Sequence, residues 1–234
     1  MNKIIVTLIF LSVAFGVKAQ EDTTAVNSNT KPAIYWLYHN NYNMAMRYSD
    51  MAEAKSALYS LISIEPQNDS LRYNLAYIYF DNQQYASAIL VGMDILAINP
   101  THAPTLELSA IAYEELGLRD KALSAYQSLY NSTEDIITLY KMTYLQYQLK
   151  RFVECGVNFE ILLEDKEIDS KELYFNLSET EQKPYSLRVA VLNLRGLVKK
   201  EQGDIDGARA DFNAVLDLAP DFIFAKNNLE ELDK

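Results

Sequence analysis

The C-terminal segment 221–233 has the hydrophobic pattern of an amphipathic helix. Its apolar residues recur at spacings of three and four, so they share one face, while lysine, asparagine and glutamate lie away from it. The apolar face consists of Phe222, Ala225, Leu229 and Leu232. We predict an end helix that covers the core with this face and presents its polar face to water.

A longer pattern of small, aromatic and proline positions repeats along the chain. In the stretch "GDIDGARADFNAVLDLAP", Ala208 is followed by Phe212 four residues later and by Pro220 twelve residues later. The same spacing of twelve separates Ala54 from Pro66 and Ala88 from Pro100, and Ala54, Ala88 and Ala122 are 34 residues apart. A fixed period of this length is the sequence signature of a helical repeat array.

The residue types in this pattern have a physical reason. Two helices that cross closely need a small residue at the crossing, and we expect Ala208 and Gly196 to serve in the last repeat; a larger side chain would overpack it at a cost of about 1–3 kcal/mol. Phe212 lies one turn after Ala208 and fills the space between repeats. Pro220 has no N–H and ends the helix. Each repeat leaves an apolar face that only its neighbour covers.

This period and pattern resemble the tetratricopeptide repeat (TPR) family, in which each unit is a pair of antiparallel helices with small residues at both crossing positions. The resemblance implies an all-α, right-handed α-solenoid of about five TPR helix pairs over residues 33–234. The expected units are 35–68, 69–102, 103–136, 137–170 and 189–222, with an insertion at 171–188 between the last two units and the solvating end helix at 221–233.

The units match the family pattern unequally. The second unit carries Leu75, Ala76, Tyr79, Ala88 and Pro100 at the expected places. The fourth unit lacks the proline, and Gly156 is its expected small residue. In the last unit, Arg195 and Lys199 stand where apolar and aromatic residues are usual.

The insertion has a different pattern from the helices around it. Leu173, Phe175 and Leu177 alternate with polar or tyrosine positions, which is the period of a β-strand. A short β-hairpin and an extended loop packed on the solenoid are both consistent with this segment. Because insertions in repeat proteins often lie on one working face, residues 171–188 are a candidate contact site.

The first twenty residues have the pattern of a signal peptide. Lys3 precedes an apolar run from Ile4 to Val17, and small or β-branched residues precede Gln20. The segment resembles export signals of some Gram-negative bacteria. We predict a signal peptide at 1–20, a polar linker at 21–32 and an exported, most simply periplasmic, protein; secretion and an uncleaved N-terminal membrane anchor are the alternatives. Any membrane contact would come through this export signal.

Composition narrows the function further. The chain has 21 basic and 32 acidic residues, a formal net charge of −11, and lacks a basic stripe, which disfavours nucleic-acid binding. The single cysteine, Cys155, has no partner for an intrachain disulfide and is expected to be a small buried residue. The two histidines, His39 and His102, lie in different units, and no motif of a hydrolase, nucleotide-binding or metal site appears. We therefore expect no catalytic residues, no metal and no cofactor.

The resemblance also indicates where a partner would bind. In TPR proteins, four positions of the first helix of each unit line the concave groove. Transferred to this chain, they give a candidate partner-binding set of Trp36, His39, Asn43, Tyr73, Tyr77, Phe80, Ile111 and Lys141. The basic positions that grip a C-terminal carboxylate in some TPR cochaperones are occupied here by His39, Pro104 and Leu108, which disfavours such a clamp.

These observations leave two main functional hypotheses; a third, a hydrolase subunit, is disfavoured because no catalytic motif appears. The first is a non-enzymatic adaptor or scaffold that binds a protein or peptide of the bacterial cell envelope, with the groove aromatics as anchors. The second is a carbohydrate-binding accessory protein whose aromatics stack on sugar rings. The same aromatics would have no binding role if they only cover the N-terminal end of the core.

Overall fold

The computed structural model describes residues 31–177 and 181–233. The expected signal peptide and all but the last two residues of the expected linker lie outside this range. The described residues form five antiparallel helix pairs, a two-stranded sheet and one further helix. The helix pairs are α1 (Ala33–Arg47) and α2 (Met51–Ile64), α3 (Asp69–Asp81) and α4 (Tyr85–Ile98), α5 (Ala103–Glu115) and α6 (Arg119–Thr133), α7 (Ile136–Gln148) and α8 (Phe152–Glu164), and α9 (Leu187–Glu201) and α10 (Ile205–Leu218).

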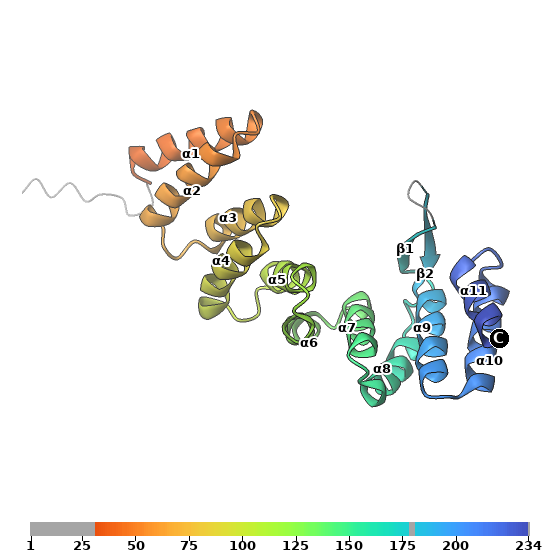
Figure 1. Cartoon of the computed structure of the whole chain (residues 1–234). Coiled ribbons are helices and arrows are strands. Elements are labelled where there is room, and N and C mark those ends of the chain that lie inside the picture. The colour runs from red at the N-terminus through yellow and green to blue at the C-terminus, as the bar shows by residue number, and fades with distance from the viewer. Residues whose placement is uncertain (1–30, 178–180, 234) are drawn as a thin grey trace, which may run out of the picture.

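The pairs follow one another in a curved row from α1–α2 to α9–α10, as Figure 1 shows. The helix α11 (Ile223–Leu232) packs on the last pair. The strands β1 (Glu172–Asn176) and β2 (Gln182–Ser186) come between the fourth and fifth pairs in the sequence and stand at the N-terminal end of α9. This arrangement confirms the predicted helical solenoid with one insertion and an end helix. Within the described part of the chain, no helix has both the length and the hydropathy that crossing a membrane requires.

The helix crossings explain the small positions in the repeat. Ala54, Ala88, Ala122 and Ala208 have no exposed surface, and each is the fourth residue of the second helix of its pair. At Gly196 an added β-carbon would lie 2.5 Å from Cε1 of Phe212, which is itself fully buried. The contact at this crossing is therefore between the glycine of α9 and the aromatic ring of α10, which leaves no room for a β-carbon.

The turns within the pairs reveal a one-residue offset in the fourth pair. A residue with positive φ closes the first helix at Ser49, Gln83, Gly117 and Lys150, so the spacing falls from 34 to 33 at the fourth pair. The cause is Glu134, whose left-handed backbone (φ 52°) ends α6 and allows α7 to begin at Ile136.

This offset corrects the small position expected in the fourth unit. Gly156 is exposed and has no atom within 4 Å of a β-carbon position, whereas Cys155 is fully buried and occupies the place of Ala122. Its thiol donates a hydrogen bond to the carbonyl oxygen of Thr143 at 3.6 Å. Cys155 is thus the buried small residue that the sequence predicted, and it also serves as the crossing residue.

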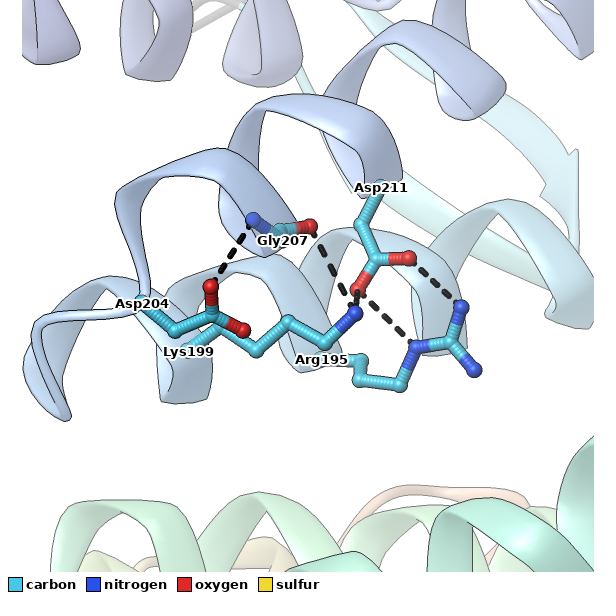
Figure 2. A network of polar contacts seen from close by, with 5 residues as sticks. All are labelled: Arg195, Lys199, Asp204, Gly207 and Asp211. Atoms are coloured by element: carbon cyan, nitrogen blue, oxygen red, sulfur yellow. Dashed lines mark hydrogen bonds and ion pairs between the residues drawn. The ribbon is translucent and has the colours of Figure 1, made fainter.

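The crossing of α9 and α10 also explains the unusual cations of the last unit. Asp211 is only 4% exposed, and Arg195 holds it through two nitrogens at 2.9 and 2.5 Å. The Lys199 ammonium lies 2.8 Å from the same carboxylate (Figure 2). Two cations on one helix are therefore compensated by one buried carboxylate on the next helix.

The insertion is a β-hairpin, which decides between the two structures that the sequence left open. The strands β1 and β2 pair antiparallel with Leu173 opposite Tyr185 and Phe175 opposite Lys183. The half-buried side chains of β1 are the alternate residues Leu173 and Phe175. Phe175 contacts Phe222 edge to face at 5.1 Å between ring centroids, and Tyr185 contacts Phe222 in the same way at 4.9 Å. These rings fix the hairpin to the start of α11.

Candidate functional site

A pocket of about 440 Å³ lies where the first helices of the last three pairs approach the hairpin and the end helix. We call it the α7–α9 pocket. Aromatic and aliphatic side chains form most of its wall, and three polar side chains are placed among them. It is lined by Glu114, Tyr140, Lys141, Tyr144, Leu173, Tyr174, Phe175, Asn193, Leu194, Leu197 and Phe224.

Helical spacing brings the wall residues of each helix to one side. Tyr140 and Tyr144 are four residues apart on α7, and Asn193 and Leu197 are four residues apart on α9, so each pair lies on one helix face. The hairpin supplies three consecutive residues of β1, and α11 supplies Phe224 near its first turn. The pocket is therefore formed by repeat helices on one side and by non-repeat elements on the other.

The polar groups of the wall are tied to neighbours within the fold. The hydroxyl of Tyr126 donates a 2.6 Å hydrogen bond to the Glu114 carboxylate. Burial, together with this carboxylate, raises the pKa of Tyr126 above its ordinary value, so the phenol stays neutral. Lys141 lies 3.5 Å from the Glu107 carboxylate and 5.7 Å from the centre of the Tyr126 ring. Glu114 is consequently an engaged acceptor, while Lys141 is only loosely paired.

The end helix is held to the pocket by two polar contacts. Asn228 of α11 donates to the side-chain oxygen of Asn193 at 3.2 Å, and Lys200 of α9 pairs with Glu231 at 2.5 Å. These contacts fix α11 alongside α9 and so fix Phe224 at the pocket wall. Burial also raises the pKa of Tyr140, so this residue contributes a neutral amphipathic ring to the pocket wall.

The residues that the sequence assigned to one groove lie on the first helices of four successive pairs, α1, α3, α5 and α7. Lys141 lines the α7–α9 pocket. Trp36 and His39 lie on α1, where their rings are 5.8 Å apart, and Asn43 is 3.2 Å from the Nδ1 atom of His39. Trp36 is 52% exposed. This cluster belongs to the first pair, at the opposite end of the row from the pocket (Figure 1).

The remaining predicted residues lie on α3 and α5. Tyr73 packs beside His102 at 5.8 Å, and Phe80 packs edge to face on Tyr85 at 5.4 Å. Tyr77 is 52% exposed, and Ile111 is half-buried. The four predicted tryptophan, tyrosine and phenylalanine residues therefore all lie in the two N-terminal pairs, and three of them, Trp36, Tyr73 and Phe80, pack against neighbouring rings.

Tyr140 and Tyr144 lie outside the set that the sequence predicted. The offset at Glu134 moves the pattern of the fourth pair back by one residue, so that Tyr140 and Tyr144 join Lys141 at the pocket. Leu145 is 1% exposed, whereas Tyr144 is 41% exposed. Two features of the sequence signalled this shift. The third unit has Glu134 where the pattern expects a proline, twelve residues after Ala122, and a second small residue, Cys155, directly precedes Gly156.

Among the described residues, no group of three or more histidine, cysteine, aspartate or glutamate side chains is placed to hold a metal ion. The polar side chains of the α7–α9 pocket are one carboxylate, one ammonium and one amide. This arrangement can hydrogen-bond to a partner's backbone or side chains and can bury an apolar side chain between the rings.

Comparison with known proteins identifies the repeat. Residues 189–222, which contain α10 and most of α9, match the family model described as tetratricopeptide repeat. A 68-residue stretch is 38% identical to anaphase-promoting complex subunit 3 of Dictyostelium discoideum, and it spans 29% of this chain and 7% of that protein.

Solved structures agree on the fold. A tetratricopeptide repeat protein from Parabacteroides merdae superposes with a TM-score of 0.63 at 21% identity, covering 85% of this chain and 72% of that chain. YrrB, described as a TPR protein with an unusual peptide-binding site, superposes with a TM-score of 0.65 at 14% identity, covering 89% of this chain and 97% of that chain. At these identities the likeness shows the architecture.

Proposed function

Given that the chain is a tetratricopeptide repeat solenoid, we propose that it is a non-enzymatic adaptor that binds an extended segment of a partner protein in the α7–α9 pocket. The observation that carries this proposal is the composition of the pocket, with tyrosine, phenylalanine and leucine side chains around a loosely paired lysine. Rigid aromatic side chains with polar tips are the residue types that anchor protein interfaces.

The size of the pocket supports a short segment as the occupant. A volume of about 440 Å³ falls within the usual range of ~300–1,000 Å³ for binding sites of small ligands. It holds the side chains of a few residues and has no room for a folded element. The segment would bury one large apolar side chain between Tyr144 and Leu197, with an acidic or carbonyl group near Lys141.

A protein segment fits this wall better than a sugar does. Sugar recognition needs several free hydrogen-bonding groups beside the stacking rings, because each hydroxyl that loses water must find a partner. Glu114 already accepts from Tyr126, and Asn193 already accepts from Asn228. The peptide-binding description of YrrB, a structural neighbour, supports the same choice.

The test uses a peptide display library selected on the immobilised wild-type protein. The pocket variant is Tyr144→Ala/Tyr174→Ala, because both rings are substantially exposed, at 41% and 64%, and their loss should leave the fold intact. We expect the selected peptides to bind this variant about tenfold or more weakly, a loss of ~1.4 kcal/mol. Tyr48→Ala is the matched control, since Tyr48 is 70% exposed and lies at the end of α1.

A second variant tests the groove that the sequence first indicated. If Trp36→Ala/Tyr73→Ala/Tyr77→Ala abolishes peptide binding and the pocket variant does not, the binding site lies in the N-terminal pairs. The carbohydrate hypothesis would be supported instead if the wild-type protein retained a protease-resistant component of the cell envelope and free sugars eluted it.

We further propose that the adaptor works in the cell envelope of a bacterium, because residues 1–20 have the pattern of an export signal. Expression of the full chain in a Gram-negative host tests this directly. The expected result is a periplasmic protein whose intact mass corresponds to removal of about the first 19 or 20 residues. Recovery of the full-length mass from the cytoplasm would refute the proposed location.

A further inference from the structure

The outer face of α8 carries an exposed stripe of branched apolar side chains. Val153, Val157 and Ile161 are spaced by four residues and therefore lie in line along the helix. Their exposed fractions are 84%, 57% and 44%. Single exposed apolar residues are common, but an aligned set on one helix face is typical of an interaction surface.

The third helix pair shows that the fold does not need apolar residues here. When α6 and α8 are aligned from their first residues, the stripe corresponds to Asp120, Ser124 and Ser128 of α6, all of which are exposed. Both helices are the second helix of their pair. The apolar stripe is therefore present on α8 and absent from α6, and packing within the chain does not explain this difference.

A groove of about 400 Å³ runs beside the stripe, between α8 and α9. Phe152, Phe159 and Leu163 of α8 and Val198 of α9 form its apolar wall. Gly156 lies in the same wall, and no atom lies within 4 Å of where its β-carbon would be. The glycine therefore keeps the groove open without any packing requirement.

The α9 wall of the groove is cationic. Arg195 and Lys199 line it, and their side chains are 31% and 29% exposed although both contact the buried Asp211. One carboxylate thus compensates two cations (Figure 2), and this carboxylate belongs to Asp211, which is only 4% exposed. Glu160 lines the opposite, α8 wall of the groove. The groove is therefore polarised, with positive charge on the α9 wall and negative charge on the α8 wall.

We infer that the α8 stripe and its groove form a second docking surface, which takes an amphipathic helix of a partner protein. The apolar face of that helix would cover Val153, Val157 and Ile161, and an acidic residue beside this face would pair with Arg195 and Lys199. The surface lies on the side of α9 opposite to Asn193 and Leu197 of the α7–α9 pocket, because Arg195, Lys199 and Gln202 project from the other face of that helix.

A second copy of the chain fits this surface poorly. A two-fold axis through Val157 would bring Glu160 of one copy against Glu154 of the other, which Arg151 already pairs, so Glu160 would meet a carboxylate and no unpaired cation. A helix from another protein can instead place opposite charges on both walls.

The probe for this surface is a displayed library of helical peptides with apolar residues fixed at positions i, i+4 and i+8. The positions that flank this stripe are randomised between acidic, basic and serine residues. Selection on the wild-type protein should enrich peptides with an acid on one flank. Changing that acid to glutamine should weaken binding about tenfold. Added salt should weaken binding of the acidic peptide more than binding of the glutamine peptide, because salt screens the charge pair.

The protein variant Val153→Ser/Val157→Ser/Ile161→Ser gives α8 a polar face like that of α6. We expect a loss of about tenfold or more in peptide affinity, with an unchanged helical circular dichroism spectrum. The single change Val157→Ser provides a milder version if the triple variant is poorly folded. The pocket variant Tyr144→Ala/Tyr174→Ala should retain full affinity for these helices, which separates this surface from the proposed pocket.

Three results would overturn the inference. The first is failure to enrich any helix, or enrichment of helices that bind the triple serine variant equally well. The second is enrichment of basic residues at both flanks. The third is a wild-type dimer in sedimentation experiments that the triple serine change converts to a monomer, because the occupant would then be a second copy of the chain.

Discussion

The crossing of α9 and α10 gives a direct test of how the repeat packs. In Gly196→Ala, the new methyl carbon would lie 2.5, 2.9 and 3.0 Å from three ring atoms of Phe212. Because the ring is fully buried, it must shift as a whole, and overpacking of this kind costs about 1–3 kcal/mol. Alanine is also the better helix former by about 1 kcal/mol. The net expectation is a loss of roughly 1 kcal/mol in stability.

Gly156 is the matched control for this change. It also lies inside a helix, but it is exposed and has no atom within 4 Å of its β-carbon position. Gly156→Ala should therefore gain the helix-propensity term of about 1 kcal/mol and meet no steric cost. The difference between the two variants isolates the steric term, because both exchange the same residue types within a helix.

Urea unfolding followed by circular dichroism measures both variants, and hydrogen exchange of the α9 and α10 amides reports on the affected pair locally. Phe212→Leu provides a further check. In that background, Gly196→Ala should be less destabilising than in the wild type, since the obstructing ring is gone. The reasoning fails if Gly196→Ala stabilises the protein as much as Gly156→Ala does.

Three other predictions follow from buried or paired groups. Asp211→Asn should cost about 1–3 kcal/mol in urea unfolding, because it leaves two adjacent cations without their carboxylate; an unchanged midpoint would contradict this. Cys155 is fully buried and its pKa is raised to about 11 by burial, so thiol reagents at neutral pH should label it about tenfold or more slowly than in urea. The hydrogen bonds from Arg188 lower the pKa of Asp169, so this ion pair stabilises the fold above pH ~4 and loses its effect as the pH falls through the lowered pKa. Cleavage of the hairpin by pepsin should therefore accelerate over that pH range in the wild-type protein. The rate should change less in Asp169→Asn, which lacks the titrating carboxyl group.

The repeat fold was predictable because it rests on local rules. The crossing residues Ala54, Ala88 and Ala122 are fully buried at the 34-residue spacing that the sequence shows. The alternating residues of 172–176 likewise indicated a strand, since side chains of a strand alternate between two faces. Patterns of this kind depend on residues close together in the chain, so they can be read without knowing the tertiary structure.

The pocket was not predictable in the same way. Its position depends on a one-residue shift at Glu134, which brings Tyr140 and Tyr144 beside Lys141 on the groove side of α7. A left-handed glutamate is not signalled by its residue type, because asparagine and glycine are the usual residues in that conformation. The frame expected from the family spacing was therefore wrong by one residue in the fourth pair, although the family resemblance was right.

The cations of α9 show a second limit of reading one repeat at a time. Arg195 and Lys199 depart from the usual apolar pattern, and taken alone they weaken the match of the last unit. Asp211, sixteen and twelve residues later, explains both departures, because the three charges form one compensated group across the crossing. Such exchanges are intelligible only when the two helices of a unit are considered together.

The site itself arises where the repeat is interrupted. A regular array presents its groove as an open surface, because each pair adds the same two helices at the same angle. Here β1 contributes Leu173, Tyr174 and Phe175 to one side of the pocket, and the rings of Phe175 and Phe222 connect that side to α11. These contacts join residues 47 positions apart, so no local pattern encodes them. The two elements that depart from the repeat therefore convert part of its groove into a bounded pocket, and recognition should depend on the hairpin as much as on the helices.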